Sequence, residues 1–480
     1  MYKKLAISFI FCLNLIMLVA CGKTEPPEEE EPVKKTYTVE SYVTLGNKEK
    51  LLNKEADKQT DLNLKANGTK IRLDPSKLYQ EMDGFGAALT ESSAVVISGL
   101  DETSKQQVLE DLFGDSGISM SFMRLTIGAS DFSLNNYTYN DTEDNIPDLE
   151  LANFSIDREK EKLIPLIKEA VSLNPELNIM ASPWSAPAWM KGNKSLNGGS
   201  LLDQYIDVYA EYFVKYLKSM AEEGVEIYAV TPQNEPLHQT SGYPSMYMLP
   251  NQQINLIVAM GKRFVEENIK TLIMAYDHNW DRMDYPITVT NSKAKDYVAG
   301  AALHGYGGEV KDTGRYQNAF PDKGIWFTEI SGGLWATNFA DNITWSMENI
   351  FIGSIKYGAK GVLMWNIALD ENQGPKNGGC TNCRGVLTIN SQTGEVIKNE
   401  EYYTIGHFSK FIRNGARKIE STVSNQQLLQ AAFLNPDGSI VLVVHNKTKI
   451  PQSFSISIHS GEVVYSLPGQ GTQTFIFYEN

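Results

Sequence analysis

Two glutamates in this chain of 480 residues stand where a carboxylate could do chemistry. Glu235 follows the apolar run at residues 225–231, and Glu329 lies at the end of the apolar run at residues 324–330. A buried charge at the end of such a run is costly unless it has a partner or a task. For either glutamate alone, an ion pair at a strand end is the alternative. Taken together, the two residues indicate the paired carboxyl groups of glycoside hydrolysis.

That chemistry needs the two carboxyl groups in different protonation states. One must stay protonated in order to protonate the leaving oxygen, and the other must stay ionised in order to attack the anomeric carbon. Burial and a neighbouring charge would raise the pKa of the acid and produce this difference. Arg124 could hold a carboxylate ionised, Asn234 could bond a sugar hydroxyl, and Tyr306 could orient the nucleophile. Tryptophans would supply flat surfaces for sugar rings.

Short apolar runs in the sequence predict β-strands, and these strands must position the candidate residues. The apolar runs alternate with longer amphipathic runs, such as residues 157–173, 202–222 and 251–268. This alternation predicts an α/β fold with parallel strands, and eight such units predict a closed (β/α)8 TIM barrel rather than an open sheet. Function in a barrel collects at the C-terminal ends of the strands, where both glutamates stand. The expected strands are residues 82–90, 121–128, 177–183, 225–231, 271–277, 298–306, 324–330 and 361–368.

The last part of the chain carries strand patterns and no helical periodicity. Residues 438–444 and 473–478 alternate or run apolar between turn signals, which predicts a small antiparallel β-sandwich. Strands near Lys70 are expected to complete its sheet. The predicted organisation is a signal peptide at residues 1–20, a flexible acidic tether at 21–36, N-terminal strands of the sandwich at 37–78, a catalytic barrel at 79–405 and the C-terminal sandwich at 406–480.

Composition excludes several classes of protein. Hydrophobic residues make up 42% of the chain and charged residues 21%, which excludes a mainly disordered chain and a polytopic membrane protein. Asp and Glu number 58 against 43 Lys and Arg, and the formal net charge is −15. This balance argues against a nucleic acid partner, because phosphate binding needs a basic face. A neutral glycan needs no such charge complement.

The N-terminus has the pattern of an export signal. Lys3 and Lys4 precede an apolar run at residues 5–20 that is too short for a comfortable membrane span. Residues 18–22 resemble a bacterial lipobox, which implies cleavage before Cys21 and lipid attachment to its thiol; an uncleaved signal anchor is the alternative. Glutamates at 28–31 look like a surface-export signal or a plain spacer. We expect an outer membrane lipoprotein, exposed at the cell surface and held only by its N-terminal lipid.

The other candidate binding motifs are weak. Cys380 and Cys383 form one C-x-x-C with no second pair and no histidine cluster, which makes a poor zinc site. They are expected to form a local disulfide or a structural thiol pair. The glycines at 84 and 86 lack the third glycine and the downstream acid of a dinucleotide site. No metal and no organic cofactor is implied.

Motifs in order along the chain carry a resemblance to a known family. The sequence resembles glycoside hydrolase family 30, whose fold is a barrel plus a β-sandwich built from both chain ends. The matching motifs are GFGAALT at 84–90, SDFS at 130–133, YTY at 137–139, ASPWSAP at 181–187, TPQNEP at 231–236, FTE at 327–329, WN at 365–366 and GHFSKFI at 406–412.

The resemblance implies a role for each candidate residue. Glu235 would be the general acid/base and Glu329 the nucleophile of a retaining double displacement, with the carboxyl groups about 5–5.5 Å apart. Asn234 would bond the 2-hydroxyl of the sugar, and Arg124 would belong to the same site. The subsite of the non-reducing sugar would be lined by Asp131, Trp184 and Trp365. The surroundings of the two carboxyl groups would be shaped by Tyr243, His304 and Tyr306.

The resemblance leaves several substrates open. Family members include glucosylceramidases and enzymes that cleave β-1,6-glucan. The segments SGYPSMY at 241–247 and GGCTNCRG at 378–385 look more like the second branch, and a surface lipoprotein suits a soluble polysaccharide. We therefore expect an endo-acting β-1,6-glucanase whose partner is a β-glucan polysaccharide or oligosaccharide. The alternatives are a glucosylceramidase, a broad β-glucosidase, a β-xylosidase, and a carbohydrate-binding lipoprotein without catalysis.

Overall fold

A computed structural model describes residues 35–480 of the chain. The predicted signal peptide, most of the tether and the predicted lipid on Cys21 lie outside the described residues. They stay predictions, which mass spectrometry of the membrane fraction would test. Among the described residues, no helix combines the length and the hydropathy needed to cross a membrane.

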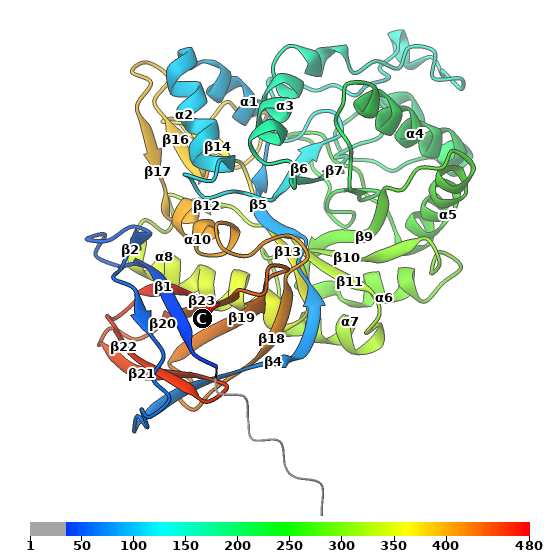
Figure 1. Ribbon diagram of the computed structural model, residues 1–480. Helices are drawn as coiled ribbons and strands as arrows, with labels where there is room; N and C mark the ends of the chain where they lie inside the picture. Colours follow the sequence, from blue (N-terminus) through cyan, green and yellow to red (C-terminus); the bar gives the residue numbers. More distant parts are fainter. Residues whose placement is uncertain (1–34) are drawn as a thin grey trace, which may run out of the picture. The chain divides into compact units, whose positions relative to one another are not determined.

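The centre of the structure is a closed barrel of eight parallel strands (Figure 1). Every predicted barrel strand overlaps an observed one, so the predicted fold class, a TIM barrel with an appended antiparallel sandwich, is confirmed. Short apolar segments form the strands because both faces of each are covered, by barrel interior or by helices. The strands are β5 (Gly84–Ala88), β6 (Phe122–Thr126), β7 (Asn178–Ser182), β8 (Ala229–Val230), β9 (Leu272–Asn279), β10 (Val298–His304), β11 (Gly324–Glu329) and β13 (Ala359–Met364).

Amphipathic helices cover the outside of the barrel. In α4 (Ile206–Glu222) the buried side chains recur every three or four residues, as in Tyr209, Phe213, Tyr216 and Met220, and they face the strands. Pro250 is the first residue of α5 (Pro250–Glu266), where its missing N–H costs no helical hydrogen bond. The other helices are α1 (Glu91–Ser98), α2 (Glu102–Phe113), α3 (Leu163–Leu173), α6 (Asp284–Thr290), α7 (Thr313–Ala319), α8 (Phe339–Trp345), α9 (Ile352–Lys356) and α10 (Glu400–Ser409).

The β-sandwich domain is built from both ends of the described chain. Strand β1 (Tyr37–Thr44) pairs antiparallel with the last strand, β23 (Thr472–Glu479), and the two lie side by side in Figure 1. β4 (Thr69–Glu81) lies between β18 (Arg417–Val423) and β21 (Gln452–Ile458). The remaining strands of this sheet are β2 (Asn53–Lys54), β3 (Lys58–Gln59), β19 (Leu428–Leu434), β20 (Ile440–Asn446) and β22 (Gly461–Leu467).

Two predicted domain boundaries fall inside elements. The boundary at 78/79 lies within β4, a strand of 13 residues that leaves the sandwich and leads into the barrel. The boundary at 405/406 lies within α10, a helix that the sequence pattern did not indicate and that contacts both β5 and β23. Continuous elements therefore join the barrel to the sandwich at both crossings, and no flexible linker separates them.

A short ribbon outside the barrel ties two loops together. β12 (Gly332–Gly333) follows β11 and pairs antiparallel with β15 (Cys383–Arg384). Of the alternatives for the C-x-x-C, the structure has the disulfide between Cys380 and Cys383. A second small sheet of β14 (Ala368–Asp370), β16 (Leu387–Ile389) and β17 (Val396–Lys398) supports the same region. The loop after β11 is thus attached to the loop that carries the disulfide.

Candidate active site

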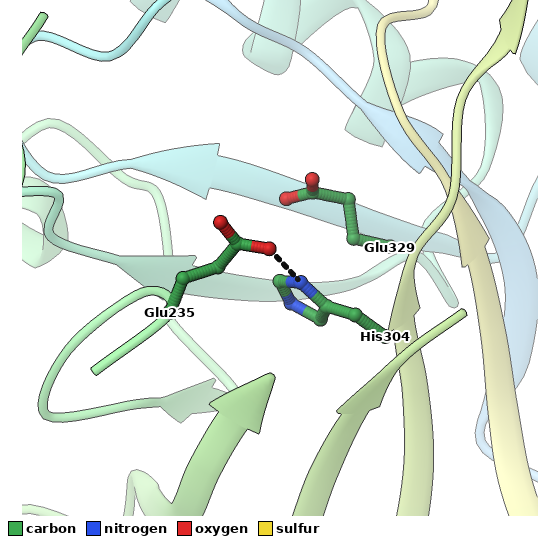
Figure 2. A group of neighbouring side chains, drawn as sticks. All are labelled: Glu235, His304 and Glu329. Atoms are coloured by element: carbon green, nitrogen blue, oxygen red, sulfur yellow. Dashed lines mark hydrogen bonds and ion pairs between the residues drawn. The ribbon is translucent and has the colours of Figure 1, made fainter. Parts of the chain in front are cut away.

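The two glutamates meet at the C-terminal end of the barrel strands. Glu235 follows β8, and Glu329 is the last residue of β11. A carboxyl oxygen of each glutamate and a ring nitrogen of His304 all lie within 4.8 Å of one another. Figure 2 shows the three side chains pointing toward one another, with Glu235 on a loop and His304 and Glu329 at the ends of strands. The alternation of strands and helices therefore places residues that are almost 100 positions apart in one small group.

Both oxygens of Glu329 accept a hydrogen bond. The buried guanidinium of Arg124 donates from Nη1 to Oε2, and the Tyr306 hydroxyl donates to Oε1 at 2.9 Å. Arg124 also donates from Nη2 to Asn234 Oδ1 at 2.7 Å. These contacts satisfy an ionised carboxylate at Glu329 and fix its orientation.

Asp277 is a site residue that sequence reasoning missed. It lies in β9, is fully buried, and accepts from the hydroxyls of Ser182, Thr231 and Thr328 at 2.7 Å each. Arg124 Nη2 donates to the same carboxylate at 2.9 Å. The sequence contained a signal for it, because Asp277 is the last residue of the predicted strand 271–277.

His304 lies between two carboxylates. Its Nε2 is 2.9 Å from Asp277 Oδ1, and its Nδ1 is 3.2 Å from Glu235 Oε1. Both ring nitrogens face acceptors, so the ring carries both protons. Burial would lower the pKa of His304, but the charge of Glu329 and the hydrogen bond and charge of Asp277 outweigh burial and raise it to about 9.

The pKa shifts of the two carboxyl groups have directions opposite to those expected. Burial raises the pKa of Glu329, and the charge of Glu235 adds to this against the opposing charges of His304 and Arg124. Burial would also raise the pKa of Glu235, but the hydrogen bond and the charge of His304 lower it to about 2. The sequence did not show that a histidine would face Glu235, and this contact lowers the pKa of Glu235, which is opposite to the direction expected for the acid.

His304 and Glu235 share one proton across their hydrogen bond, and the proton can lie on either Nδ1 of His304 or Oε1 of Glu235. With the proton on Nδ1 the pair is an imidazolium and a carboxylate; with the proton on Oε1 it is a neutral imidazole and a carboxylic acid. Both arrangements have the same total charge and use the same hydrogen bond, so the two groups titrate as a pair. The pair can therefore supply a proton from Glu235 although the carboxylate form dominates in the free site.

The spacing of Glu235, His304 and Glu329 is also one that could hold a metal ion. The donor set does not fit one, because an imidazolium has no free lone pair and His304 uses both nitrogens toward carboxylates. Arg124 already supplies a positive charge at Glu329. The arrangement is therefore that of an acid/base site whose charges the protein balances itself.

A second cluster beside the carboxyl pair contains the remaining predicted residues. The rings of Trp184 and Trp365 stack with centroids 5.2 Å apart, and Arg124 lies 5.0 and 5.4 Å from the two rings. Both tryptophans are only 3% exposed, so most of their surface packs on protein. Tyr243 packs against the same cluster, which includes the half-cystines Cys380 and Cys383.

Asp131 lies where this cluster meets the disulfide loop. A Cβ at Gly379 would lie 2.6 Å from the Asp131 side chain, so the loop packs directly on it. Burial, followed by the charge of Glu329, raises the pKa of Asp131 well above its usual range. The structure thus brings all the predicted site residues of the barrel into one region: Arg124 comes from the middle of β6, and the others come from strand ends or the loops after them.

The backbone is strained at several of these positions. Glu235, Tyr276, Asp277 and Asn366 have φ values of 45°, 79°, 68° and 48°, which non-glycine residues rarely adopt. Such conformations persist where the surrounding structure enforces them, and they concentrate at functional sites.

Replacing Asp277 with asparagine tests its role as a positioning residue. We expect the kcat of glycoside hydrolysis to fall roughly 10²-fold, because His304 would lose the carboxylate that holds it against Glu235. Asp277 raises the pKa of His304, so its loss should shift the basic limb of the pH profile from about 9 to lower pH. The measurement is kcat against pH, with the exposed Asp296→Asn as control. A lower kcat with an unshifted limb would contradict this role.

Comparisons with known proteins agree with this geometry. The glycosyl hydrolase family 30 TIM-barrel domain matches residues 82–412, and the beta sandwich domain of the same family matches residues 415–475. Endo-1,6-beta-D-glucanase BGN16.3 of Trichoderma harzianum is 34% identical over 409 residues, which are 80% of this chain and 81% of that protein. Lysosomal acid glucosylceramidase of Mus musculus is 30% identical over 437 residues, which are 85% of this chain and 84% of that protein.

A solved protein structure is similar to this chain in both sequence and fold. The endo-beta1,6-glucanase BT3312 is 33% identical and superposes with a TM-score of 0.86, over 92% of this chain and 99% of that chain. The likeness covers both the barrel and the sandwich.

Proposed function

The chain belongs to glycosyl hydrolase family 30 and is a glycoside hydrolase, and on this basis we propose that it cleaves β-1,6-glucosidic bonds of β-glucan with retention of configuration. In this proposal Glu329 is the nucleophile and Glu235 the general acid/base. The observation that carries it is the group of Glu235, His304 and Glu329 (Figure 2), in which oxygens of the two glutamates lie within 4.8 Å of each other. In addition, Arg124 and Tyr306 donate to Glu329. A short separation is what attack by the second carboxylate requires.

The first step forms a covalent intermediate. An oxygen of Glu329 attacks the anomeric carbon, and the bond from that carbon to the leaving oxygen breaks. Glu235 gives the leaving oxygen the proton that it shares with His304 Nδ1 at 3.2 Å. Asn234, which is held by Arg124, is placed to bond a hydroxyl of the sugar while charge develops on the ring.

The second step returns the enzyme to its starting state. Glu235, now a carboxylate, takes a proton from water, and the oxygen of that water attacks the anomeric carbon. The bond to Glu329 breaks, and its carboxylate again accepts from Arg124 and Tyr306. Between the steps the pair lacks the shared proton, so Glu235 is a carboxylate and His304 a neutral imidazole until water returns the proton.

Two loop segments support β-1,6-glucan as the substrate. Residues 241–247 and 378–385, whose motifs favour the glucanase branch, pack on each other beside the second cluster. A Cβ at Gly378 would lie 2.1 Å from the carbonyl oxygen of Gly242, so the backbones are in direct contact. Since the second segment packs on Asp131 through Gly379, and Tyr243 of the first packs against the cluster of Trp184 and Trp365, differences in the segments reach the proposed sugar site. Similarity to enzymes named endo-1,6-glucanases points the same way.

One assay tests substrate and stereochemistry together. Pustulan, a β-1,6-glucan, is incubated with the enzyme beside β-1,3-glucan, xylan and glucosylceramide. We expect gluco-oligosaccharides from pustulan, with the β-anomer formed first in the NMR spectrum. Release from glucosylceramide alone would favour the second candidate function, to which the 30% identity with the mouse enzyme points. An α-anomer formed first would refute the nucleophile role of Glu329.

A further inference from the structure

A cavity of about 430 Å³ lies next to the carboxyl pair and is not used by the mechanism above. Its walls come from the loop after β11, the end of α8, and the start of α10. We call it the tryptophan cavity, after Trp335 and Trp345, which line it together with Tyr306, Arg384, Glu400 and Glu401. A volume of this size is within the usual range for small-ligand sites.

The tryptophan cavity begins at the catalytic centre. Tyr306 lines it, and the hydroxyl of the same side chain donates to Glu329 at 2.9 Å. Ile330 and Ser331, which follow Glu329 along the chain, also line it. Trp184 and Trp365 do not, so this space is separate from the cluster around Asp131.

Its two tryptophans differ from all the others in the chain. Trp335 is 56% exposed and Trp345 is 46% exposed, whereas the other five of the seven tryptophans are 2–3% exposed. Exposed indole surface is unfavourable in water and commonly marks a binding site. A tryptophan ring offers a flat apolar face, which suits the C–H face of a pyranose.

Both tryptophans are held by structured backbone. A Cβ at Gly333 would lie 2.0 Å from the Trp335 ring, so the indole packs on the ribbon of β12 and β15. Leu334 donates from its backbone N–H to the carbonyl of Asn382 at 2.8 Å, which ties the same loop to the disulfide segment. Trp345 is followed by a π-helical turn at Ser346–Phe351, a feature found often at functional sites.

The floor of the tryptophan cavity is polar. Arg384 donates to Glu401 at 2.7 and 3.1 Å, and a Cβ at Gly332 would lie 1.8 Å from Glu401, so only glycine leaves room for this pair. Glu400 lies beside them and is 3% exposed. Apolar walls with a few fixed polar groups are the pattern of sites that bind hydroxyl-bearing ligands.

We propose that the tryptophan cavity binds the glucosyl units on the leaving-group side of the scissile bond, with Trp335 and Trp345 as stacking surfaces and the Arg384–Glu401 pair facing the sugar hydroxyls. This inference rests on the proposed function. A glucan whose reacting unit lies against Glu329 must continue past the anomeric carbon, and the exposed ring of Tyr306 leads from that carboxylate into the cavity. The disulfide loop closes the side of the active site at Asp131. That side of the site therefore holds the glycosyl unit.

The test compares substrates with and without leaving-group sugars. The variants Trp335→Ala and Trp345→Ala are assayed on β-1,6-linked gluco-oligosaccharides and on β-glucosyl fluoride, whose leaving group is a single atom. We expect kcat/KM on the oligosaccharides to fall roughly 10-fold for each variant, and kcat/KM on the fluoride to stay within about twofold. Trp335→Phe, which keeps a ring, should recover most of the loss.

The control is Tyr478→Ala, which removes an aromatic side chain of similar exposure, 43%, from the sandwich. It should leave both substrates unaffected. Equal losses on oligosaccharide and fluoride, or no loss on either, would overturn the inference. If the wild-type enzyme releases nothing from β-1,6-glucan, the proposed function fails and the inference falls with it, whereas wild-type activity with unaffected variants refutes the inference alone.

Discussion

Replacing Glu329 with glutamine is expected to lower kcat for glucan hydrolysis by roughly 10⁴-fold or more, because the amide cannot form the glycosyl-enzyme bond. The fold should persist. The amide oxygen can still accept from Arg124 or Tyr306, and Arg124 keeps its ion pair with Asp277 at 2.9 Å. The measurement is single-turnover hydrolysis of a gluco-oligosaccharide, with thermal unfolding followed in parallel.

The matched control for this variant is Glu309→Gln. Glu309 is an exposed glutamate whose ion pair is with Lys311 on the surface, and its replacement should leave kcat unchanged. The active-site variant should lose activity on every substrate, including one with an activated leaving group, since the nucleophile is needed for all of them. Near-normal turnover by Glu329→Gln would remove Glu329 from the mechanism.

Replacing Glu235 with glutamine is expected to lower kcat on glucan by roughly 10²–10⁴-fold, because the leaving oxygen then departs without a proton. The loss should depend on the leaving group. A dinitrophenyl β-glucoside needs no proton on its leaving oxygen, so the covalent intermediate should form at nearly the wild-type rate and then accumulate. Azide, a nucleophile that needs no general base, should release the intermediate as glucosyl azide.

The pH dependence provides a check on the same assignment. The proton shared by His304 and Glu235 is retained below the raised His304 pKa of about 9 and is lost as the pH rises through it. Wild-type hydrolysis of glucan should therefore decline above about pH 9, while formation of the intermediate from the dinitrophenyl substrate should not. Equal losses by Glu235→Gln on activated and unactivated substrates would contradict the acid role.

The positions of Glu235 and Glu329 could be predicted from the sequence because a local rule marks them. Glu235 follows a short apolar strand and Glu329 ends one, and parallel barrel strands bring such ends together. Asp277 also ends a predicted strand, but the sequence did not show which groups it would contact. Its partners Ser182, Thr231 and Thr328 come from separate strands or their ends, and no local pattern connects them.

The protonation states depended on side-chain geometry that the sequence pattern does not contain. Which nitrogen of His304 faces which carboxylate decides whether Glu235 is stabilised as an anion or as an acid. The tryptophan cavity was missed for another reason. Trp335 lies several residues beyond the end of β11 and Trp345 ends a helix, and the other tryptophans of the described chain are buried, so only the structure distinguishes the exposed two.

The pairing of β1 with β23 sets the order in which the molecule can assemble. Tyr37 lies opposite Glu479, so the first described strand must wait for β23 to be synthesised. The barrel residues emerge in between and can pack before the sandwich closes. β23 also lies between β1 and β20, so a chain that ended before its eight residues would leave two strands with open edges. Premature termination would thus yield an aggregation-prone product even with the entire catalytic barrel translated.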